Sequence, residues 1–204
     1  MALSADELNV SRETFERLEI YVSLVEKWTS KINLIAKSTI PHIWSRHIMD
    51  SVQLCKAGPD SFDLWVDMGS GAGFPGIVAA IMAQDSSSQK TVTLVESDQR
   101  KAAFLRAALR ETGVSGAVMP QRIEALTPQN ANVVSARALA DLTTLLSYAD
   151  RHLANSGVAL FSKGANWEKE VEDAKVAWSF SCVAVKSQTE EGAVMLRIGE
   201  ITRV

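Results

Sequence analysis

Apolar residues recur every three or four positions near the start of the chain, a spacing that predicts amphipathic helices. Ser11 can cap the first long helix, whose apolar stripe belongs to the core of the fold. A further helix is predicted over roughly residues 40 to 56, around Pro41. Residues 1–60 are therefore expected to form a helical extension. The stripe consists of Phe15, Leu18, Val22, Val25 and Trp28.

From residue 63 onward, short apolar runs alternate with helical patterns, which is typical of a parallel α/β sheet. Two last apolar runs are separated by a polar turn and predict an antiparallel hairpin. Residues 61–204 are thus expected to form a Rossmann-like, mostly parallel sheet, in one structural unit with the extension. The predicted strands are Leu64–Val66, Thr91–Glu96, Ala117–Met119, Asn132–Ala136, Gly157–Gly164, Cys182–Lys186 and Ala193–Ile198, and helices are expected over 76–82, 98–113, 141–154 and 167–178, with a polar loop at 84–90.

Composition is that of an ordinary globular protein: 204 residues, 47% hydrophobic and 22% charged. The net charge of −3 means that any RNA contact must use a local basic patch. Cys55 and Cys182 are expected to be buried thiols, and the three histidines lack the spacing of metal ligands, so no metal is predicted. Neither a signal peptide nor a membrane-spanning run is visible, so a cytoplasmic protein without membrane contact is expected.

The most informative segment runs from Asp67 to Gly76 and reads as strand, glycine turn and helix. Glycines allow positive φ and let a ligand lie against the backbone, and such a turn at the carboxyl end of a strand is where cofactors bind. Glu96 ends the next strand, where a carboxylate can accept hydrogen bonds from both ribose hydroxyls. The pair predicts a nucleoside cofactor, with Gly69, Gly71 and Gly73 in its binding loop.

The turn matches the dinucleotide pattern G-x-G-x-x-G literally, but three features favour S-adenosylmethionine over NAD. Pro75 removes an N–H that a pyrophosphate would use. Asp67 would repel a diphosphate and would hold the cationic amino-acid end of S-adenosylmethionine. The chain also lacks a region large enough for a dehydrogenase substrate domain, and its terminal hairpin is like that of a class I methyltransferase sheet.

The predicted helix around residues 40–56 carries an unusual polar set. Arg46 and Asp50 are four residues apart, as are His47 and Ser51. Such a set is equally explained by a solvated ion pair, worth a few tenths of a kcal/mol, or by a cap over a substrate cleft.

With these residues in place, the chain resembles the bacterial 16S ribosomal RNA methyltransferase G family, also called glucose-inhibited division protein B. The resemblance covers nearly the whole chain and rests on several motifs in the right order. They are Asn33-Leu34, Arg46–Ser51, Asp67–Gly76, Glu96-Ser97, Lys101–Leu105, Arg122–Glu124, Ser135–Ala138 and Lys163-Gly164.

The resemblance implies a class I fold with an N-terminal helical cap and methylation of guanine N7 in the 530 loop of 16S ribosomal RNA. It places cofactor contacts on Gly69, Phe74, Ile123, Glu124 and Arg137. The implied partner is 16S ribosomal RNA, in a ribosomal subunit or an assembly intermediate, and the protein is expected to be a monomer.

This chemistry fits the residues available. Guanine N7 already carries an in-plane lone pair, so attack on a sulfonium methyl group needs no general base, and positioning can supply much of the catalysis. Arg137 and Lys163 follow the fourth and fifth strands and are the candidates for positioning the substrate. The competing interpretation for both is a salt bridge, with Asp67, Glu124 or Asp141 as partner.

Two other functions stay open at this point. One is a methyltransferase that acts on another RNA, a protein or a small molecule, and the other is a dinucleotide-binding regulator. The sequence also leaves open which of Arg46, His47, Arg122 and Lys163 would touch RNA, and whether naked RNA or a subunit is the substrate.

Overall fold

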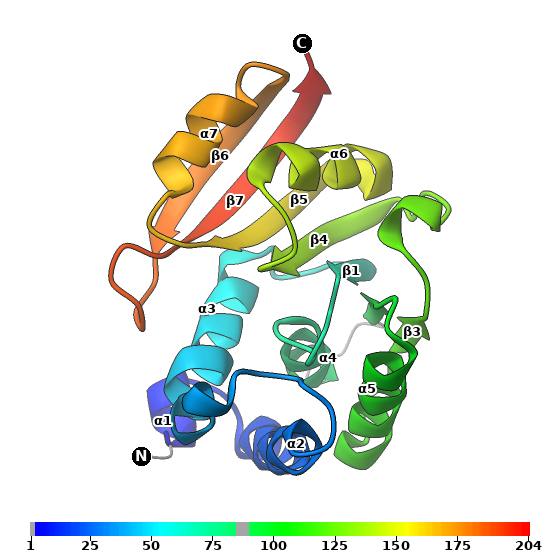
Figure 1. Ribbon diagram of the computed structural model, residues 1–204, viewed down its shortest axis with the longest axis vertical. Helices are drawn as coiled ribbons and strands as arrows, with labels where there is room; N and C mark the ends of the chain where they lie inside the picture. The colour runs from blue at the N-terminus through cyan, green and yellow to red at the C-terminus, as the bar shows by residue number, and fades with distance from the viewer. Residues whose placement is uncertain (1–2, 85–89) are drawn as a thin grey trace.

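The computed structural model describes residues 3–84 and 90–204. Most of the predicted polar loop at 84–90 therefore lies outside the described residues. The chain begins with helices, continues as alternating strands and helices, and ends in a β-hairpin (Figure 1).

The N-terminal helices begin at side-chain caps, of which the one at Ser11 is predicted from the sequence. Ser4 and Glu7 form a capping box, and the Ser11 hydroxyl accepts a hydrogen bond from the Thr14 N–H. The segment predicted as one helix over 40–56 consists of three joined pieces of different pitch. The elements are α1 (Ala5–Leu8), α2 (Arg12–Thr29), the 3₁₀ helix η1 (Lys37–His42), the π-helical turn η2 (Trp44–Ile48) and α3 (Met49–Ala57).

The remaining elements form one sheet with flanking helices. Strand order is β3-β2-β1-β4-β5-β7-β6; the first five strands are parallel, and β7 is antiparallel to both β5 and β6. The elements are β1 (Leu64–Met68), α4 (Gly76–Gln84), β2 (Thr91–Val95), α5 (Gln99–Thr112), β3 (Ala117–Met119), η3 (Ile123–Ala125), β4 (Ala131–Arg137), α6 (Leu142–His152), β5 (Leu153–Lys163), α7 (Trp167–Ala174), β6 (Trp178–Lys186) and β7 (Val194–Arg203). The predicted α/β fold, a mostly parallel sheet with a terminal antiparallel hairpin, is confirmed.

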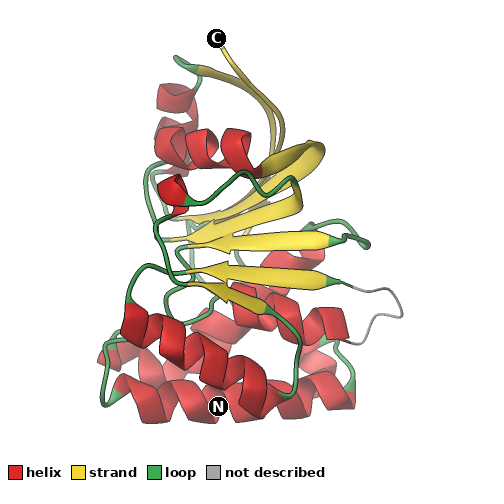
Figure 2. Cartoon of the chain, turned by 90° about the vertical axis from the view of Figure 1, so that its right-hand side faces the viewer, coloured by secondary structure: helices red, strands yellow, loops and turns green. Residues whose placement is uncertain are grey.

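Alternate residues of each strand point to opposite faces of the sheet, so they belong to two separate hydrophobic clusters. Trp65 and Val133 pack with the N-terminal helices, α4 and α5, whereas Val66 and Val134 pack with α6 and α7. The helices accordingly lie on both faces of the sheet (Figure 2). Residues of α2 belong to the same hydrophobic cluster as residues of the sheet, so the helical extension predicted for residues 1–60 packs directly against the sheet.

Two local expectations need correction. The helix predicted over 167–178 ends at Ala174, and Trp178 instead begins β6, opposite Arg203, with its side chain 4% exposed. Cys55 and Cys182 are free thiols, as expected, but both are only partly buried.

Within residues 3–84 and 90–204, no helix is long and apolar enough to cross a membrane. In the same described ranges, no group of three or more His, Cys, Asp or Glu side chains is arranged to hold a metal ion.

Candidate active site

The turn after β1 takes its shape from glycines in conformations that other residues rarely adopt. Gly69 has φ +64°, and a Cβ there would lie 2.5 Å from Leu139 Cδ1. At Gly76, a Cβ would overlap the side chains of Leu94 and Asp67, so glycine lets the start of α4 approach the sheet. The strand–turn–helix order read from the sequence is present.

The Asp67 side chain lies against the turn at Gly76 and is held there by a chain of hydrogen bonds. Trp65 Nε1 donates to Ser135 Oγ at 2.8 Å, and Ser135 Oγ donates to Asp67 Oδ1 at 2.7 Å. Asp67 is 1% exposed, and burial raises its carboxyl pKa to about 6, although hydrogen bonds from Ser135 and Ser70 act in the opposite direction.

Tyr21, in α2, reaches the same turn from the N-terminal extension. Its hydroxyl donates to the Ala72 carbonyl oxygen at 2.6 Å, and the residue is fully buried. The N-terminal helices thus help to shape the glycine turn directly. Tyr21 is not among the predicted site residues, although a hydroxyl beside the apolar stripe of α2 indicates a buried polar contact.

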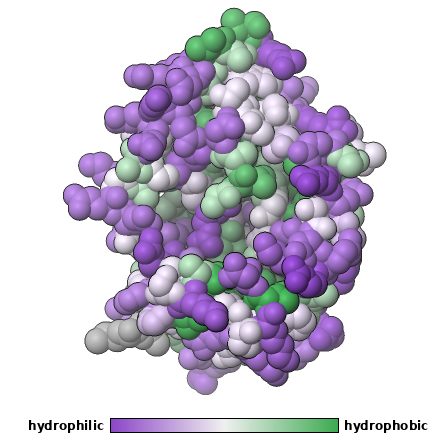
Figure 3. All heavy atoms as spheres, in the orientation of Figure 1, coloured by the Kyte–Doolittle hydropathy of each residue, from purple (hydrophilic) through white to green (hydrophobic). Residues whose placement is uncertain are grey.

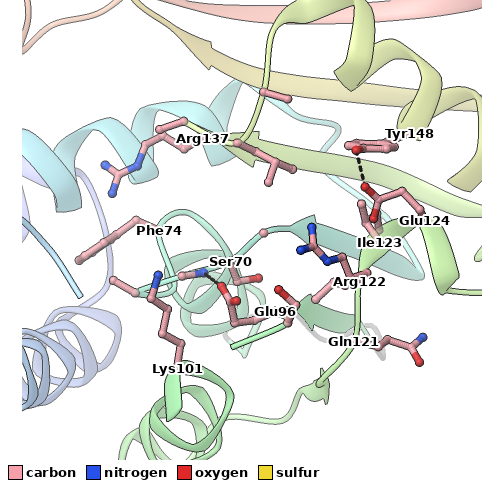
Figure 4. A pocket seen from close by; sticks show the side chains of 18 of the residues that line it. Ser70, Phe74, Glu96, Lys101, Gln121, Arg122, Ile123, Glu124, Arg137 and Tyr148 are labelled. Carbon is pink, nitrogen blue, oxygen red and sulfur yellow. Dashed lines mark hydrogen bonds between the residues drawn. The ribbon is translucent and has the colours of Figure 1, made fainter. Parts of the chain in front are cut away.

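Glu96 follows β2 and connects the turn to the next loop (Figure 4). Its Oε2 accepts from the Gly71 N–H and its Oε1 from the Asp98 N–H, both at 2.8 Å. The side chain is 8% exposed and lines a cavity of about 460 Å³ at the carboxyl ends of the parallel strands. In Figure 2 the carboxyl ends of these strands point to the left, which is the side that faces the viewer in Figure 3. Figure 3 shows a hollow there, with pale and hydrophobic atoms within a largely hydrophilic face.

Most of the predicted cofactor residues line this cavity, which we therefore name the cofactor cavity. Its wall opposite Glu96 is formed by η3 and α6. Tyr148 donates its hydroxyl hydrogen to Glu124 Oε1 at 2.7 Å, as Figure 4 shows. Behind them, buried His152 lies with its Nε2 3.2 Å from the Ile123 carbonyl oxygen. Neither Tyr148 nor His152 is among the predicted site residues.

Seven of the nine predicted cofactor residues line the cavity, namely Gly69, Gly71, Phe74, Glu96, Ile123, Glu124 and Arg137. Asp67 and Gly73 do not line it. A direct contact between Asp67 and the cationic end of the cofactor therefore needs correction, because its buried side chain points toward Ser135. Gly73 faces Ile77 and the Tyr21 hydroxyl behind the turn.

Arg137 lies at the end of β4, stacked in a cluster with Phe74 and His47. Its guanidinium carbon is 5.0 Å from the centre of the Phe74 ring, and the His47 and Phe74 rings stack with centroids 5.0 Å apart. Arg137 Nη1 lies 2.9 Å from His47 Nδ1, and His47 Nε2 lies 3.0 Å from Thr39 Oγ1.

These contacts fit a neutral imidazole that accepts from Arg137 at Nδ1 and donates to Thr39 at Nε2. Burial, together with the charges of Arg137 and Arg46, lowers the pKa of His47 to about 4. The predicted salt bridges of Arg137 with Asp67, Glu124 or Asp141 are not formed among the described residues.

Lys163, by contrast, is an ion-pair residue. Its Nζ lies 2.5 Å from Glu170 Oε2 and donates to the Ala140 carbonyl oxygen at 3.0 Å. Glu170 in turn accepts from the Leu142 N–H at 2.9 Å. Lys163 therefore anchors the loop after β4 through a partner in α7 rather than through any of the three carboxylates that the sequence suggested.

The Arg46–Asp50 ion pair weighed from the sequence is absent, and both residues bind the β6–β7 loop instead. Arg46 Nη2 lies 2.8 Å from Glu190 Oε2. The Asp50 carboxylate accepts hydrogen bonds from the hydroxyls of Ser187 and Thr189.

Comparison with known proteins identifies the group to which this architecture belongs. The family model described as rRNA small subunit methyltransferase G matches residues 14–196. The chain belongs to this family. A protein of Ruegeria pomeroyi named ribosomal RNA small subunit methyltransferase G is 53% identical over 204 residues, covering 100% of both chains. A Paracoccus denitrificans protein of the same name is 48% identical over 192 residues, 94% of this chain and 97% of that one.

Solved structures agree with the family assignment at the level of fold. A ribosomal protein L11 methylase from Lactobacillus delbrueckii subsp. bulgaricus has a TM-score of 0.61 at 16% identity, covering 76% of this chain and 78% of that one. M. jannaschii TYW2 in complex with AdoMet has a TM-score of 0.60 at 14% identity, covering 86% and 80%. The sequence-based family assignment is confirmed, and S-adenosylmethionine is the cofactor of this class of methyltransferase.

The cavity itself fits this cofactor. The Gly71 N–H is taken by Glu96, the Gly73 N–H donates to the Ser70 carbonyl oxygen at 2.6 Å, and Pro75 has none, so the turn offers few donors to a diphosphate. Glu96 also lines the cavity and could accept hydrogen bonds from ribose hydroxyls, and Val95, Ile123 and Leu139 offer apolar surface on which an adenine ring could lie.

Proposed function

We propose that the protein transfers a methyl group from S-adenosylmethionine to N7 of a guanine in the 530 loop of 16S ribosomal RNA. Membership of the rRNA small subunit methyltransferase G family supports the ribosomal substrate. The position of Arg137, which lines both the cofactor cavity and a neighbouring cavity, is the observation that most supports the reaction.

The residues at this point suit a transfer without proton abstraction. Bound S-adenosylmethionine supplies the electrophilic methyl group, and guanine N7 supplies its own lone pair. Glu96 and the glycine turn hold the cofactor, while Phe74 and His47 hold the Arg137 guanidinium flat. That guanidinium can donate to guanine O6 beside N7 and so align the base for in-line attack.

The wider setting is part of the same proposal. We expect the substrate to be a small ribosomal subunit or an assembly intermediate, and the enzyme to act as a monomer in the cytoplasm. Basic residues around the site, among them Arg46, Arg122 and Arg137, are the candidates for holding the RNA on a protein of net negative charge.

The test is transfer of tritiated methyl groups to RNA from cells that lack the gene. Naked 16S RNA and intact small subunits are offered in parallel, and the labelled nucleotide is mapped by reduction and aniline cleavage, which detects N7-methylguanine. A single labelled guanine in the 530 loop is expected in at least one of the two substrates. Label at another base, or on protein alone, would contradict the proposal.

A further inference from the structure

A second cavity, of about 410 Å³, lies beside the cofactor cavity and shares Arg137 and Ala138 with it. Its walls come from η2 and α3, from the ends of β4 and β5, and from the β6–β7 loop. Cofactor binding as described above does not use this space. Its size is that of a small-ligand site.

The positively charged side chains around the second cavity differ in whether they form an ion pair with a carboxylate. Arg46 pairs with Glu190, and Lys163 pairs with Glu170. Arg137 instead contacts the neutral imidazole of His47. Among the described residues Arg137 forms no close ion pair with a carboxylate, although Asp50 and Asp67 attract its charge, and it lies on the side that this cavity shares with the cofactor cavity.

Asp50 is a negatively charged residue on the wall of the same cavity. Ser187 Oγ donates to its Oδ1 at 3.1 Å, and the Thr189 hydroxyl donates to the same oxygen. Within the described part of the chain, Oδ2 has no hydrogen-bond partner, and no cation pairs with the carboxylate. The two hydroxyls hold the side chain in place and leave its second oxygen available to a ligand.

A ligand that matches these two groups must present acceptors toward Arg137 and donors toward Asp50. Guanine has this pattern, since N7 and O6 are acceptors on one edge while N1–H and the 2-amino group are neighbouring donors on another. Oδ2 of Asp50 has two lone-pair sites, so it can accept from both of these donors while Oδ1 keeps its two hydroxyl contacts. Adenine would turn an amino donor toward Arg137 and the N1 lone pair toward Asp50, so both contacts would be unfavourable.

We infer that the second cavity receives the target guanine and that Asp50 recognises it by accepting hydrogen bonds from N1–H and the 2-amino group. The inference rests on the proposed guanine N7 reaction and adds the residue that selects the base. With N7 directed toward the cofactor cavity, O6 lies on the side of Arg137. The Watson–Crick edge then faces Asp50, so the base must be unpaired when it enters.

The experiment compares guanine with inosine, which lacks the 2-amino group, at the target position of RNA made by splinted ligation. Single-turnover methyl transfer is measured for the wild-type chain, Asp50→Ala and Asp50→Asn. Asp50→Ala is expected to slow transfer to guanine by roughly 10- to 100-fold, the range for a hydrogen bond to a charged group. The guanine-to-inosine rate ratio should fall about tenfold from wild type to this variant.

Gln53→Ala is the matched control, because Gln53 also holds the β6–β7 loop but does not line the cavity. Its Nε2 donates to the Lys186 carbonyl oxygen at 2.6 Å, and its Oε1 accepts from the Gln188 N–H at 3.1 Å. This variant should keep the wild-type rate ratio. Cofactor affinity, measured by calorimetry, should be unchanged in all variants.

An unchanged rate ratio in Asp50→Ala would overturn the inference while leaving guanine methylation intact. Loss of the ratio in Gln53→Ala would also overturn it, since loop docking would then be the determinant. If thermal melting shows that Asp50→Ala does not fold, Asp50→Asn, which keeps one acceptor, provides the same comparison. Wild-type label mapping to another nucleotide would instead overturn the proposed function, and the inference with it.

Discussion

The two cavities beside Arg137 are built in different ways. The cofactor cavity is lined mainly by the loops that follow β1, β2, β3 and β4, each with a short motif, and is completed by Leu34, Lys101 and Tyr148. The second cavity joins the N-terminal helices to the terminal hairpin, through pairs such as Arg46 with Glu190, 144 positions apart in the sequence. A site made of strand-end loops can be recognised from short sequence motifs. A site formed between segments that are distant in the sequence can be seen only in the folded structure.

Arg137→Lys tests the residue that both cavities share, and we expect the largest effect there. Lysine keeps the charge but loses the planar fork that lies over Phe74 and contacts His47. Methyl transfer at saturating RNA and cofactor should fall by one to three orders of magnitude, or about 1.4–4 kcal/mol in the barrier. The measurement is single-turnover transfer, accompanied by a thermal melt.

Arg110→Lys is the control for that substitution, because Arg110 is an exposed helix residue paired with its neighbour Glu111. It should leave the rate unchanged. Near-normal transfer by Arg137→Lys would reduce Arg137 to a general positive charge, and loss of folding would assign it to structure.

Glu96→Ala tests the cofactor cavity alone. The substitution removes the ribose acceptor and also frees the N–H groups of Gly71 and Asp98. Cofactor affinity should fall by about 1.5–3 kcal/mol, the range for hydrogen bonds to a charged group. Calorimetry with S-adenosylmethionine measures the change, and an unaltered dissociation constant would remove Glu96 from the ribose role.

The pH dependence of stability sharpens the comparison at His47. Its folded pKa of about 4 lies below the ordinary 6.5, so the unfolded chain binds more protons between these values. Stability from this group is therefore complete above pH 6.5 and is lost as the pH falls toward 4. Asp67, with its pKa raised to about 6, acts oppositely: its carboxylate destabilises the fold increasingly as the pH rises from about 4 to 6.

The variant His47→Asn isolates the histidine, because Asn keeps an acceptor for Arg137 and leaves Asp67 in both proteins. The free energy of unfolding of wild type, relative to this variant, should drop by about 1 kcal/mol between pH 7 and pH 5, after allowance for partial exposure. Urea unfolding at the two pH values measures it. A difference that does not change with pH would mean that the folded imidazole titrates normally.

The sequence predicted the parts of the site that depend on local order. Glu96 and the glycine turn could be located because each follows a strand, and parallel strands bring their carboxyl ends to one edge. Side-chain direction was harder to predict: Asp67 shares a strand face with Trp65, which directs it to Ser135 rather than into the cavity.

Partners from distant elements could not be predicted. Lys163 pairs with Glu170 of α7, and Tyr21 of α2 supports Ala72. Asp50 was noticed for its spacing from Arg46, but both side chains bind the hairpin loop instead. Such pairs depend on how helices and hairpin dock, which residue spacing along a single element does not specify.

The smallest expected effect concerns the Arg46–Glu190 ion pair, which joins the two ends of the chain at the second cavity. The two side chains are 46% and 53% exposed, so solvent screens their attraction. A double-mutant cycle with Arg46→Ala and Glu190→Ala should give a coupling free energy of about 0.2–1 kcal/mol, falling at high salt. Urea unfolding of the four proteins at low and high salt measures it. Coupling well above this range would mean that the pair, rather than the partly buried contacts of Asp50, holds the hairpin loop on η2 and α3.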